Sequence, residues 1–388
     1  MANSNLSKAK NAKNDEFYTQ YGDIQKELEA YLEYDADTFR GKVVYCNADD
    51  PYESNFFRYF VLNFDRLGLK RLITTSYKPS PVANSQLGLF GTDKTLVPKK
   101  GRPKVTANKF IINEVGDIDG DGQFNLKDVA LQLQQNKHND WAPLEGDGDF
   151  RSQECVELLK ESDIVVTNPP FSLFREYIKQ LFEYKKKFVI IGNKNAVTYK
   201  EVFPMIKNNK LWSGKTEWSG GLWFQTMDSD DIDKVVDGVK MKNVSSIWLT
   251  NLDHGRRHQQ LPLMTMADNI KFNTKVQKNP NSYKKYDNYD AIEVPFTNAI
   301  PSDYEGVMGV PISFLDKYSP EQFEIVGMCE NEDLYKNKTK VYTSAECKQA
   351  YLDKFGKKGT YDLNASGVVL KDGLLEKVYQ RILIRHKK

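Results

Sequence analysis

The tetrapeptide Asn168, Pro169, Pro170 and Phe171 has the composition of a site for an amino group. Its two prolines fix the backbone and remove two N–H donors, which leaves the Asn168 side-chain oxygen and the Pro169 carbonyl as acceptors. A planar NH2 group donates two protons, and these two oxygens can accept both. The tetrapeptide follows the apolar run DIVVT, a predicted buried strand, and ligands of open α/β sheets bind outside the carboxyl ends of strands. The simpler alternative is a turn that only ends the strand, because Pro and Asn are common in turns.

Alternating strand and helix signals surround this tetrapeptide. Helical spacing predicts a helix over 23–34, and a β-prone run at 43–46, an aromatic stretch at 55–64 and a second β-prone run at 72–76 predict a βαβ unit. Beyond about residue 254 short β-prone runs such as 307–314 appear, and the helical period returns only at the terminal KVYQRILIRHKK. Between these regions we predict helices over 155–160 and 173–184, and strands over 163–167, 188–192, 221–225 and 247–250.

Four segments together resemble one enzyme family. The string ESDIVVTNPPFSLFREYI resembles the catalytic segment of amino-group methyltransferases, in which an Asn/Asp/Ser-Pro-Pro-aromatic loop follows the fourth strand. With DEFYT (15–19), CNADDP (46–51) followed by SNFF, and GDGDFRS (146–152), the chain resembles the EcoRI-type DNA adenine-N6 methyltransferases from about residue 14 to 255. The CNADDP loop stands where most class I methyltransferases carry a Gly-rich FxGxG turn, and this departure narrows the family.

The resemblance implies a fold, a cofactor and a set of site residues. The implied fold is α/β: a class I, Rossmann-like, mostly parallel sheet with helices on both faces, followed by a carboxy-terminal α+β recognition region. The implied reaction transfers a methyl group from S-adenosylmethionine to a flipped adenine in double-stranded DNA, with Asn168, Pro169 and Pro170 at the amine and Phe171 stacked on the base. The implied cofactor residues are Phe17, Tyr18, Thr19, Asn47, Asp49 and Asp50 at the methionine end, and Asp149 and Phe150 at the adenine.

The chain divides into two predicted domains. We expect the methyltransferase domain over 1–255, with an insertion over 78–145, and a DNA target-recognition region over 256–388, because the later part has no catalytic pattern. In the loop NLDHGRRH that joins them, His254, Arg256, Arg257 and His258 could contact phosphate or base edges, or form a solvated loop.

The insertion carries two further motifs. Asp117, Asp119, Asp121, Gln123 and Asp128 have the spacing of an EF-hand or dockerin-type calcium loop, although the last position is Asp rather than the bidentate Glu. We therefore expect one structural calcium ion, against the alternative of an Asp-rich turn. Upstream, PKKGRPK with Arg102 at its centre resembles an AT-hook, whose Gly-Arg-Pro core enters the minor groove, but a solvated basic loop explains it better.

Composition bounds the class of protein. The 388 residues are 40% hydrophobic and 28% charged, which is typical of a folded soluble chain, and no window reaches the length of an apolar membrane span. The net charge of +2 means that attraction to DNA must come from local patches, and four scattered cysteines predict neither a disulfide framework nor a zinc site. We expect a cytoplasmic monomer whose partner is double-stranded DNA, and a cognate restriction endonuclease is a candidate second partner. Two alternatives stay open: methylation of protein glutamine or RNA, and a non-catalytic DNA-binding module.

Overall fold

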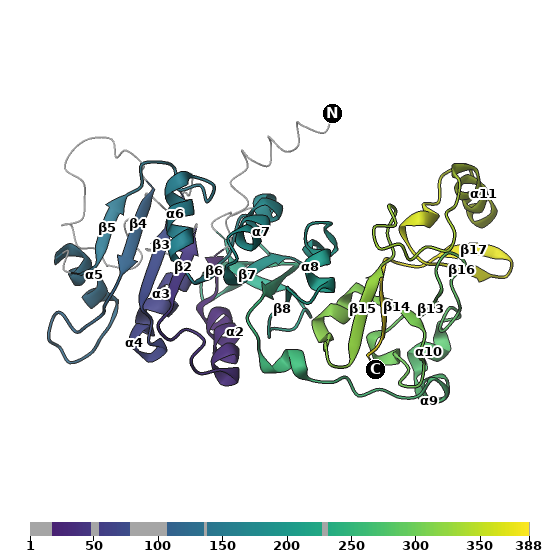
Figure 1. The fold of residues 1–388 in the computed structure, drawn as a ribbon, viewed down its shortest axis with the longest axis horizontal. Coiled ribbons are helices and arrows are strands. Elements are labelled where there is room, and N and C mark those ends of the chain that lie inside the picture. The colour runs from purple at the N-terminus through teal and green to yellow at the C-terminus, as the bar shows by residue number, and fades with distance from the viewer. Residues whose placement is uncertain (1–17, 48–53, 78–106, 136–137, 227–231, 388) are drawn as a thin grey trace. The chain divides into compact units, whose positions relative to one another are not determined.

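The computed structural model describes residues 18–47, 54–77, 107–135, 138–226 and 232–387. The chain forms two compact units (Figure 1): the first ends at Gly255, and the second contains Arg256 to the carboxy terminus together with 207–209. Among the residues that the structure describes, no helix is long and apolar enough to cross a membrane.

The first unit is built on a mixed sheet of eight strands (Figure 1). Its four central strands are parallel, and the strands that flank them on each side are antiparallel to their neighbours. The α/β class predicted from sequence is therefore confirmed. In spatial order the strands are β5 (Asp140–Pro143), β4 (Asn108–Ile112), β3 (Arg71–Thr75), β2 (Val43–Asn47), β6 (Ile164–Thr167), β7 (Lys187–Asn193), β12 (Ser246–Thr250) and β8 (Trp212–Ser213).

The chain reverses its direction of travel across this sheet between β2 and β6. From β2 it moves outward to β3, and from β6, on the other side of β2, it moves outward to β7. In open α/β sheets the carboxyl ends of strands at such a switch point leave a crevice in which ligands bind. The topology therefore predicts a ligand site beside Asn47 and Thr167, the last residues of β2 and β6.

Amphipathic helices cover the apolar strands of the sheet. In α2 (Tyr21–Tyr34), Ile24, Leu28 and Tyr31 are fully buried and join a core cluster with the aromatic residues of α3 (Asn55–Leu62). The side chain of Ser54 accepts hydrogen bonds from two N–H groups of α3, so it fixes where that helix begins. The helices of this unit are α2 (Tyr21–Tyr34), α3 (Asn55–Leu62), α4 (Phe64–Leu67), α5 (Leu126–Gln135), α6 (Gln153–Glu161), α7 (Phe174–Glu183) and α8 (Phe203–Lys207), with short 3-10 turns η2 (Phe171–Leu173) and η3 (Lys194–Thr198).

The segment predicted as an insertion is only partly separate from the sheet. Its strands β4 and β5 pair antiparallel with β3 and with each other, so they extend the sheet at one edge. Phe110 of β4 is fully buried and stacks on Trp141 of β5, with the ring centroids 5.4 Å apart. The Pro- and Lys-rich residues 78–106 lie outside the described part of the chain.

A second, smaller sheet holds the amino-terminal segment. Strand β1 (Tyr18–Thr19) pairs antiparallel with β9 (Leu222–Gln225), and the sheet continues with β11 (Val239–Val244) and β10 (Lys234–Val236). The strand predicted over 221–225 therefore exists, but it belongs to this sheet.

The second unit contains its own antiparallel-rich sheet and short helices. The sheet has the order β13 (Ala291–Glu293), β14 (Val307–Pro311), β18 (Arg381–His386) and β15 (Phe323–Met328), and a hairpin of β16 (Val368–Lys371) and β17 (Leu374–Lys377) stands apart from it. The Arg381 guanidinium forms a buried fork with the Glu293 carboxylate, with a shortest N–O distance of 2.6 Å, and joins two strands that are not neighbours. The helical elements are η4 (Gly255–His258), α9 (Met266–Phe272), α10 (Thr274–Lys278), η5 (Thr297–Ala299), η6 (Ile312–Lys317), α11 (Ser344–Phe355) and η7 (Leu363–Ala365).

The helical period predicted at the carboxy terminus is wrong, because that segment forms the inner strand β18. Residues Ile382, Leu383 and Ile384 are all buried, so both faces of the strand are covered. A strand that is apolar on both faces shows no alternation, and a continuous apolar run does not distinguish it from a buried helix.

Candidate active site

The acceptor tetrapeptide leaves the carboxyl end of β6. Asn168 and Phe171 are half-buried, Pro169 is buried, and η2 begins at Phe171. The Leu173 N–H donates to the Pro170 carbonyl at 3.0 Å, which closes the turn into α7. Phe171 is partly buried and packs against the main hydrophobic core. The sequence placed this loop between a buried strand and a helix, and both elements are confirmed.

A hydrogen bond joins the ends of β2 and β6. The Thr167 hydroxyl donates to the Asn47 carbonyl at 2.5 Å, directly before Asn168. The predicted cofactor loop after β2 and the predicted acceptor loop after β6 therefore start side by side at the switch point of the sheet.

Two predicted cofactor residues carry buried oxygens that no group in the described part of the chain satisfies. Thr19 is 4% exposed and Asn47 is 1% exposed, and among the described residues neither the Thr19 hydroxyl nor the Asn47 side-chain oxygen has a hydrogen-bond partner. Buried polar atoms are normally paired, so unpaired ones at a strand end indicate a position for a polar ligand. The Asn55 side-chain amide donates to the Thr19 carbonyl at 2.8 Å and holds β1 at the start of α3. Thr19 and Asn47 could therefore hold a polar ligand, and their assignment to the methionine end of S-adenosylmethionine stays a prediction.

The loop before α6 approaches the end of β3. Gly148 has a φ of +81°, and a Cβ there would lie 2.0 Å from the Ser76 carbonyl oxygen, so this position requires glycine. Asp149 follows, and its carboxylate accepts from the Arg151 backbone N–H and from two guanidinium nitrogens, Nε at 2.9 Å and Nη2 at 2.6 Å. These hydrogen bonds, and a further one to Glu176, raise the pKa of Arg151 above its ordinary value.

Phe150 is more deeply buried than a residue that covers a cofactor was expected to be. It is 3% exposed, and its ring lies edge-on to Tyr177 of α7 with the centroids 4.9 Å apart. The Arg151 guanidinium carbon lies 5.3 Å from the centre of the same ring. The described contacts give Phe150 a packing role, and its contact with the cofactor stays a prediction.

Several predicted site residues cannot be located. Phe17, Asp49, Asp50 and Arg102 lie outside the described residues. Tyr18 is half-buried in β1, next to Thr19.

The acidic loop at 117–128 brings three carboxylates together. Oxygens of Asp117, Asp119 and Asp128 lie within 4.8 Å of one another. Burial of Asp128 opposes its ionisation, but N–H groups of Asn125, Ile118 and Asp119 donate to it, and the pKa of Asp128 falls below its ordinary value. The Lys127 ammonium lies 2.6 Å from an Asp119 oxygen and would compete with a bound cation. Asp121 and Gln123, the other two predicted ligands, are joined by a hydrogen bond from the Gln123 N–H to the Asp121 carboxylate at 2.8 Å.

The basic segment at 254–258 is a packed turn rather than an open loop. His254 is 2% exposed, and its Nε2 lies 2.9 Å from the Ser213 carbonyl oxygen. Arg257 is 9% exposed, and its guanidinium donates to the Asn209 side chain. Arg256 pairs with Asp316 at 2.8 Å, and His258 Nδ1 lies 2.8 Å from Glu321. His254 and Arg257 therefore have no open face for DNA in this structure. The ion pairs of Arg256 with Asp316 and of His258 with Glu321 favour a role in the fold over the DNA contact expected from sequence.

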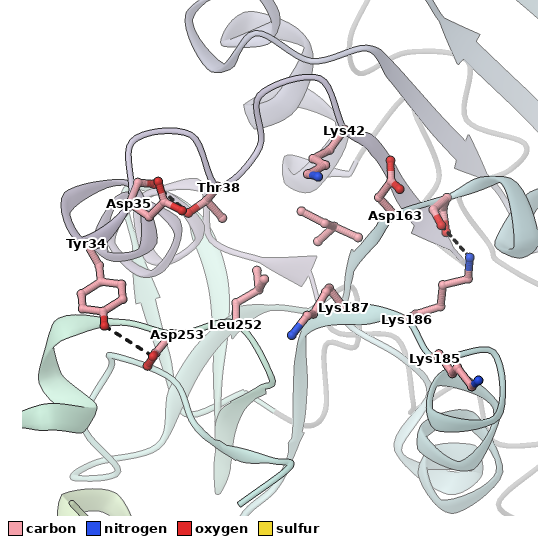
Figure 2. Close-up of a pocket in the computed structure, with 12 residues that line it drawn as sticks. Tyr34, Asp35, Thr38, Lys42, Asp163, Lys185, Lys186, Lys187, Leu252 and Asp253 are labelled. Carbon is pink, nitrogen blue, oxygen red and sulfur yellow. Dashed lines mark hydrogen bonds between the residues drawn. The ribbon is translucent and has the colours of Figure 1, made fainter. Parts of the chain in front are cut away.

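A cavity of about 480 Å³ lies at the other end of the central strands, away from the acceptor loop (Figure 2). Its lining includes Lys42, Ile164 and Lys187, which stand where β2, β6 and β7 begin. Figure 2 shows Lys186 turned back onto the chain, where its ammonium donates to the Ser162 carbonyl at 2.6 Å. Burial lowers the pKa of Lys186. Because this cavity lies at the amino ends of the parallel strands, it is distinct from the predicted methyl-transfer site.

Sequence reasoning missed the roles of Glu27 and Arg151, whose side chains join separate elements of the first unit. Glu27 is fully buried in α2 and accepts from the N–H groups of Lys215 and Thr216, which follow β8. Its spacing on the apolar face of α2, three residues after Ile24, was a signal available in the sequence. Arg151 lies in the GDGDFRS segment, but its contact with Glu176 depends on the fold and could not be predicted from that segment.

Comparisons with known proteins show the family of the chain. The model of the family described as "Adenine-specific methyltransferase EcoRI" matches residues 5–387. The chain is 45% identical to Type II methyltransferase M.EcoRI of Escherichia coli over 334 residues, which are 84% of this chain and 89% of that protein. It is 35% identical to Type II methyltransferase M.MpnI of Mycoplasma pneumoniae over 84% of this chain and 86% of that protein. No solved structure matches the chain. The chain therefore belongs to the EcoRI family of adenine-specific methyltransferases.

Proposed function

We propose that the protein transfers a methyl group from S-adenosylmethionine to N6 of adenine in double-stranded DNA. One observation carries this proposal: Asn168 to Phe171 follow β6 directly beside the end of β2, at the switch point of the sheet. Family membership supports adenine as the acceptor, and the names of the type II relatives support DNA as the substrate.

The acceptor loop would act on the amine itself. The N6 lone pair of adenine is delocalised into the ring, and two oxygens that accept both N–H protons favour a tetrahedral, nucleophilic nitrogen. The Asn168 side chain and the Pro169 carbonyl supply these oxygens, while Pro170 keeps the loop rigid. Most of the acceleration then comes from proximity and orientation. N6 would gain the methyl group as the S–C bond of the sulfonium breaks, which leaves S-adenosylhomocysteine, and N6 would then lose one proton to water, so no residue acts as a strong base.

The target adenine must leave the duplex to reach this loop. Flipping a base costs about a few kcal/mol in lost stacking and pairing. Phe171 is only half-buried, and stacking of the base on an aromatic side chain would recover roughly 1 to 3 kcal/mol.

The cofactor would bind along the carboxyl ends of β2 and β3. The unsatisfied oxygens of Thr19 and Asn47 support hydrogen bonds to its methionine end, to which Phe17, Tyr18, Asp49 and Asp50 are also assigned. Asp149 is assigned to the adenine amine of the cofactor, and Phe150 to covering the adenine ring of the cofactor. When bound, the cofactor supplies an electrophilic methyl group on its sulfonium.

The remaining parts of the chain are assigned to DNA and to one ion. We assign recognition of the DNA sequence to residues 256–388. We also propose that the protein is a monomer and that its partner protein is a cognate restriction endonuclease. A single calcium ion on Asp117, Asp119, Asp121, Gln123 and Asp128 is supported by their spacing and by three converging carboxylates.

Transfer of a labelled methyl group tests the function. Purified protein is incubated with labelled S-adenosylmethionine and, in parallel, with unmethylated duplex DNA, RNA or a protein extract, and the products are hydrolysed and identified. Label in N6-methyladenine from DNA is the expected result. Label in RNA or in protein glutamine would replace the proposal with one of the alternatives.

Calorimetry tests the ion separately. Calcium added to chelator-treated protein should bind at millimolar concentration or below and raise the melting temperature, because the loop carboxylates repel one another without it. Asp117→Asn should weaken that binding. Absence of a binding signal at millimolar calcium would leave an Asp-rich turn.

A further inference from the structure

The Arg151 guanidinium joins two parts of the chain that the proposed reaction must coordinate. Through Nε and Nη2 it forks onto both oxygens of Asp149, and through Nη1 it donates to Glu176 at 2.7 Å. Asp149 precedes α6, whereas Glu176 is in the first turn of α7. The planar guanidinium therefore holds the Asp149 carboxylate, in the loop before α6, against helix α7.

Helix α7 continues directly from the acceptor loop. Glu176 lies five residues after Phe171, with η2 between them. Two more contacts hold the Asp149 loop on the same helix: the Phe150 ring packs on Tyr177, and the Gln180 side-chain amide donates to the Phe150 carbonyl at 3.1 Å. A shift of the Asp149 loop would therefore also displace α7, the helix that follows the acceptor residues.

The exposure of the Arg151 cluster argues against a purely structural role. The side chains of Arg151 and Glu176 are 45% and 57% exposed, and exposed ion pairs contribute little to stability. Asp149 is less exposed, at 19%, and the fork holds its carboxylate in one orientation. Restricting a ligand-binding group in advance lowers the entropy cost of binding.

We infer that Arg151 is a positioning residue for the cofactor. It orients the Asp149 carboxylate toward the adenine amine of the cofactor and links that carboxylate to α7, the helix that follows the acceptor loop. This inference rests on the proposed function, specifically on Asp149 as the adenine acceptor. The inference goes beyond the proposed function because it makes Arg151 responsible for the orientation of the Asp149 carboxylate and for its link to α7.

Titration of S-adenosylhomocysteine into the full-length protein tests the inference. Arg151→Met should weaken binding about tenfold, comparable to the loss of one hydrogen bond to a charged group. Asp149→Asn should also weaken binding, and the double variant should bind within about twofold of Asp149→Asn alone, because Arg151 acts through Asp149. In methyl transfer, the rise in KM for S-adenosylmethionine should exceed the fall in kcat.

Arg66→Met is the matched control. Arg66 donates through two nitrogens to Glu29, is 49% exposed and lies in α4, away from the Asp149 loop. It should bind S-adenosylhomocysteine as the wild type does, and both Met variants should keep the wild-type melting temperature within a few degrees.

The outcomes separate this inference from the proposed function. Wild-type affinity in Arg151→Met, an equal loss in Arg66→Met, or additive losses with Asp149→Asn would each overturn the role of Arg151. Unchanged affinity in Asp149→Asn would remove Asp149 from the cofactor site and with it the inference. Methylation of an acceptor other than adenine would reject the proposed function, while the binding result for Arg151 would stand.

Discussion

The hydroxyl of Thr19 distinguishes a ligand site from ordinary packing. A buried hydroxyl without a partner costs about 1 to 3 kcal/mol of desolvation, and Val has nearly the same shape. We therefore predict that Thr19→Val raises the melting temperature of the protein without ligand and lowers its affinity for S-adenosylhomocysteine. Thermal unfolding and calorimetry measure the two effects on one preparation. A variant that is less stable and binds equally well would show that the hydroxyl serves the fold.

Local motifs made the acceptor residues predictable, whereas contacts across the fold were not. Asn168 and Phe171 are defined by four consecutive residues between a strand and a helix, and both flanking elements were predicted correctly. The contact between Arg151 and Glu176 spans 25 residues and exists only because α6 and α7 flank β6 in the fold. The unsatisfied oxygens of Thr19 and Asn47 likewise depend on burial, which sequence spacing does not report.

At the level of elements, Glu27 anchors α2 to the residues that follow β8. Its carboxylate accepts from the N–H groups of Lys215 and Thr216, from the Thr216 hydroxyl and from the Tyr31 hydroxyl, all within 2.8 Å. A Cβ at Gly214 would lie 2.0 Å from a Glu27 oxygen, so the loop has closed tightly around the carboxylate.

We predict that Glu27→Gln destabilises the protein by about 3 kcal/mol, because an amide NH2 would face N–H donors in a buried site. Chemical denaturation followed by tryptophan fluorescence measures the change. Glu157→Gln is the control, since Glu157 pairs with Lys160 at the surface and should change stability by less than about 1 kcal/mol. Equal effects of the two substitutions would contradict the anchoring role.

Element prediction succeeded for the amphipathic helix α2 and for short β-prone runs whose ends are marked by turn residues or by a change to helical spacing. The apolar stripe of α2 and the strands β2, β3, β6 and β7 agree with the sequence patterns within a few residues. Strands β4 and β5 were missed because their short runs stand in a polar segment, and their pairing with β3 is what makes them strands. The inner strand β18 was mistaken for a helix because its apolar run stands in the longer stretch 374–388, which contains no Gly, Pro, Asn or Asp to mark the ends of a strand.

The turn at 255–258 changes how its arginines should be tested. Arg256 pairs with Asp316, and the two side chains are only 16% and 10% exposed. We predict that Arg256→Met lowers the stability of the protein by about 1 to 3 kcal/mol and leaves the salt dependence of DNA binding unchanged. If Arg256 contacts phosphate, the logarithmic salt slope should fall by about 0.9 instead. Binding titrations at several salt concentrations, together with thermal unfolding, separate the two outcomes.

At the scale of the whole molecule, the net charge of +2 provides no general attraction to DNA. Recognition must therefore come from local surfaces of the two units. Because His254 and Arg257 are buried, we expect the surfaces that read DNA to lie further toward the carboxy terminus, within 256–388. This assignment predicts that the methylated sequence depends on residues that have no part in cofactor binding.

The most direct test of the account is single-molecule sequencing of DNA from cells that lack adenine methylation and express the wild-type chain or Asn168→Ala. We predict N6-methyladenine at one recurring sequence with the wild type and none with the variant. The variant should keep its melting temperature and its affinity for S-adenosylhomocysteine, because Asn168 acts on the acceptor amine. Modification of a different base, or equal adenine methylation by Asn168→Ala, would contradict the central claim.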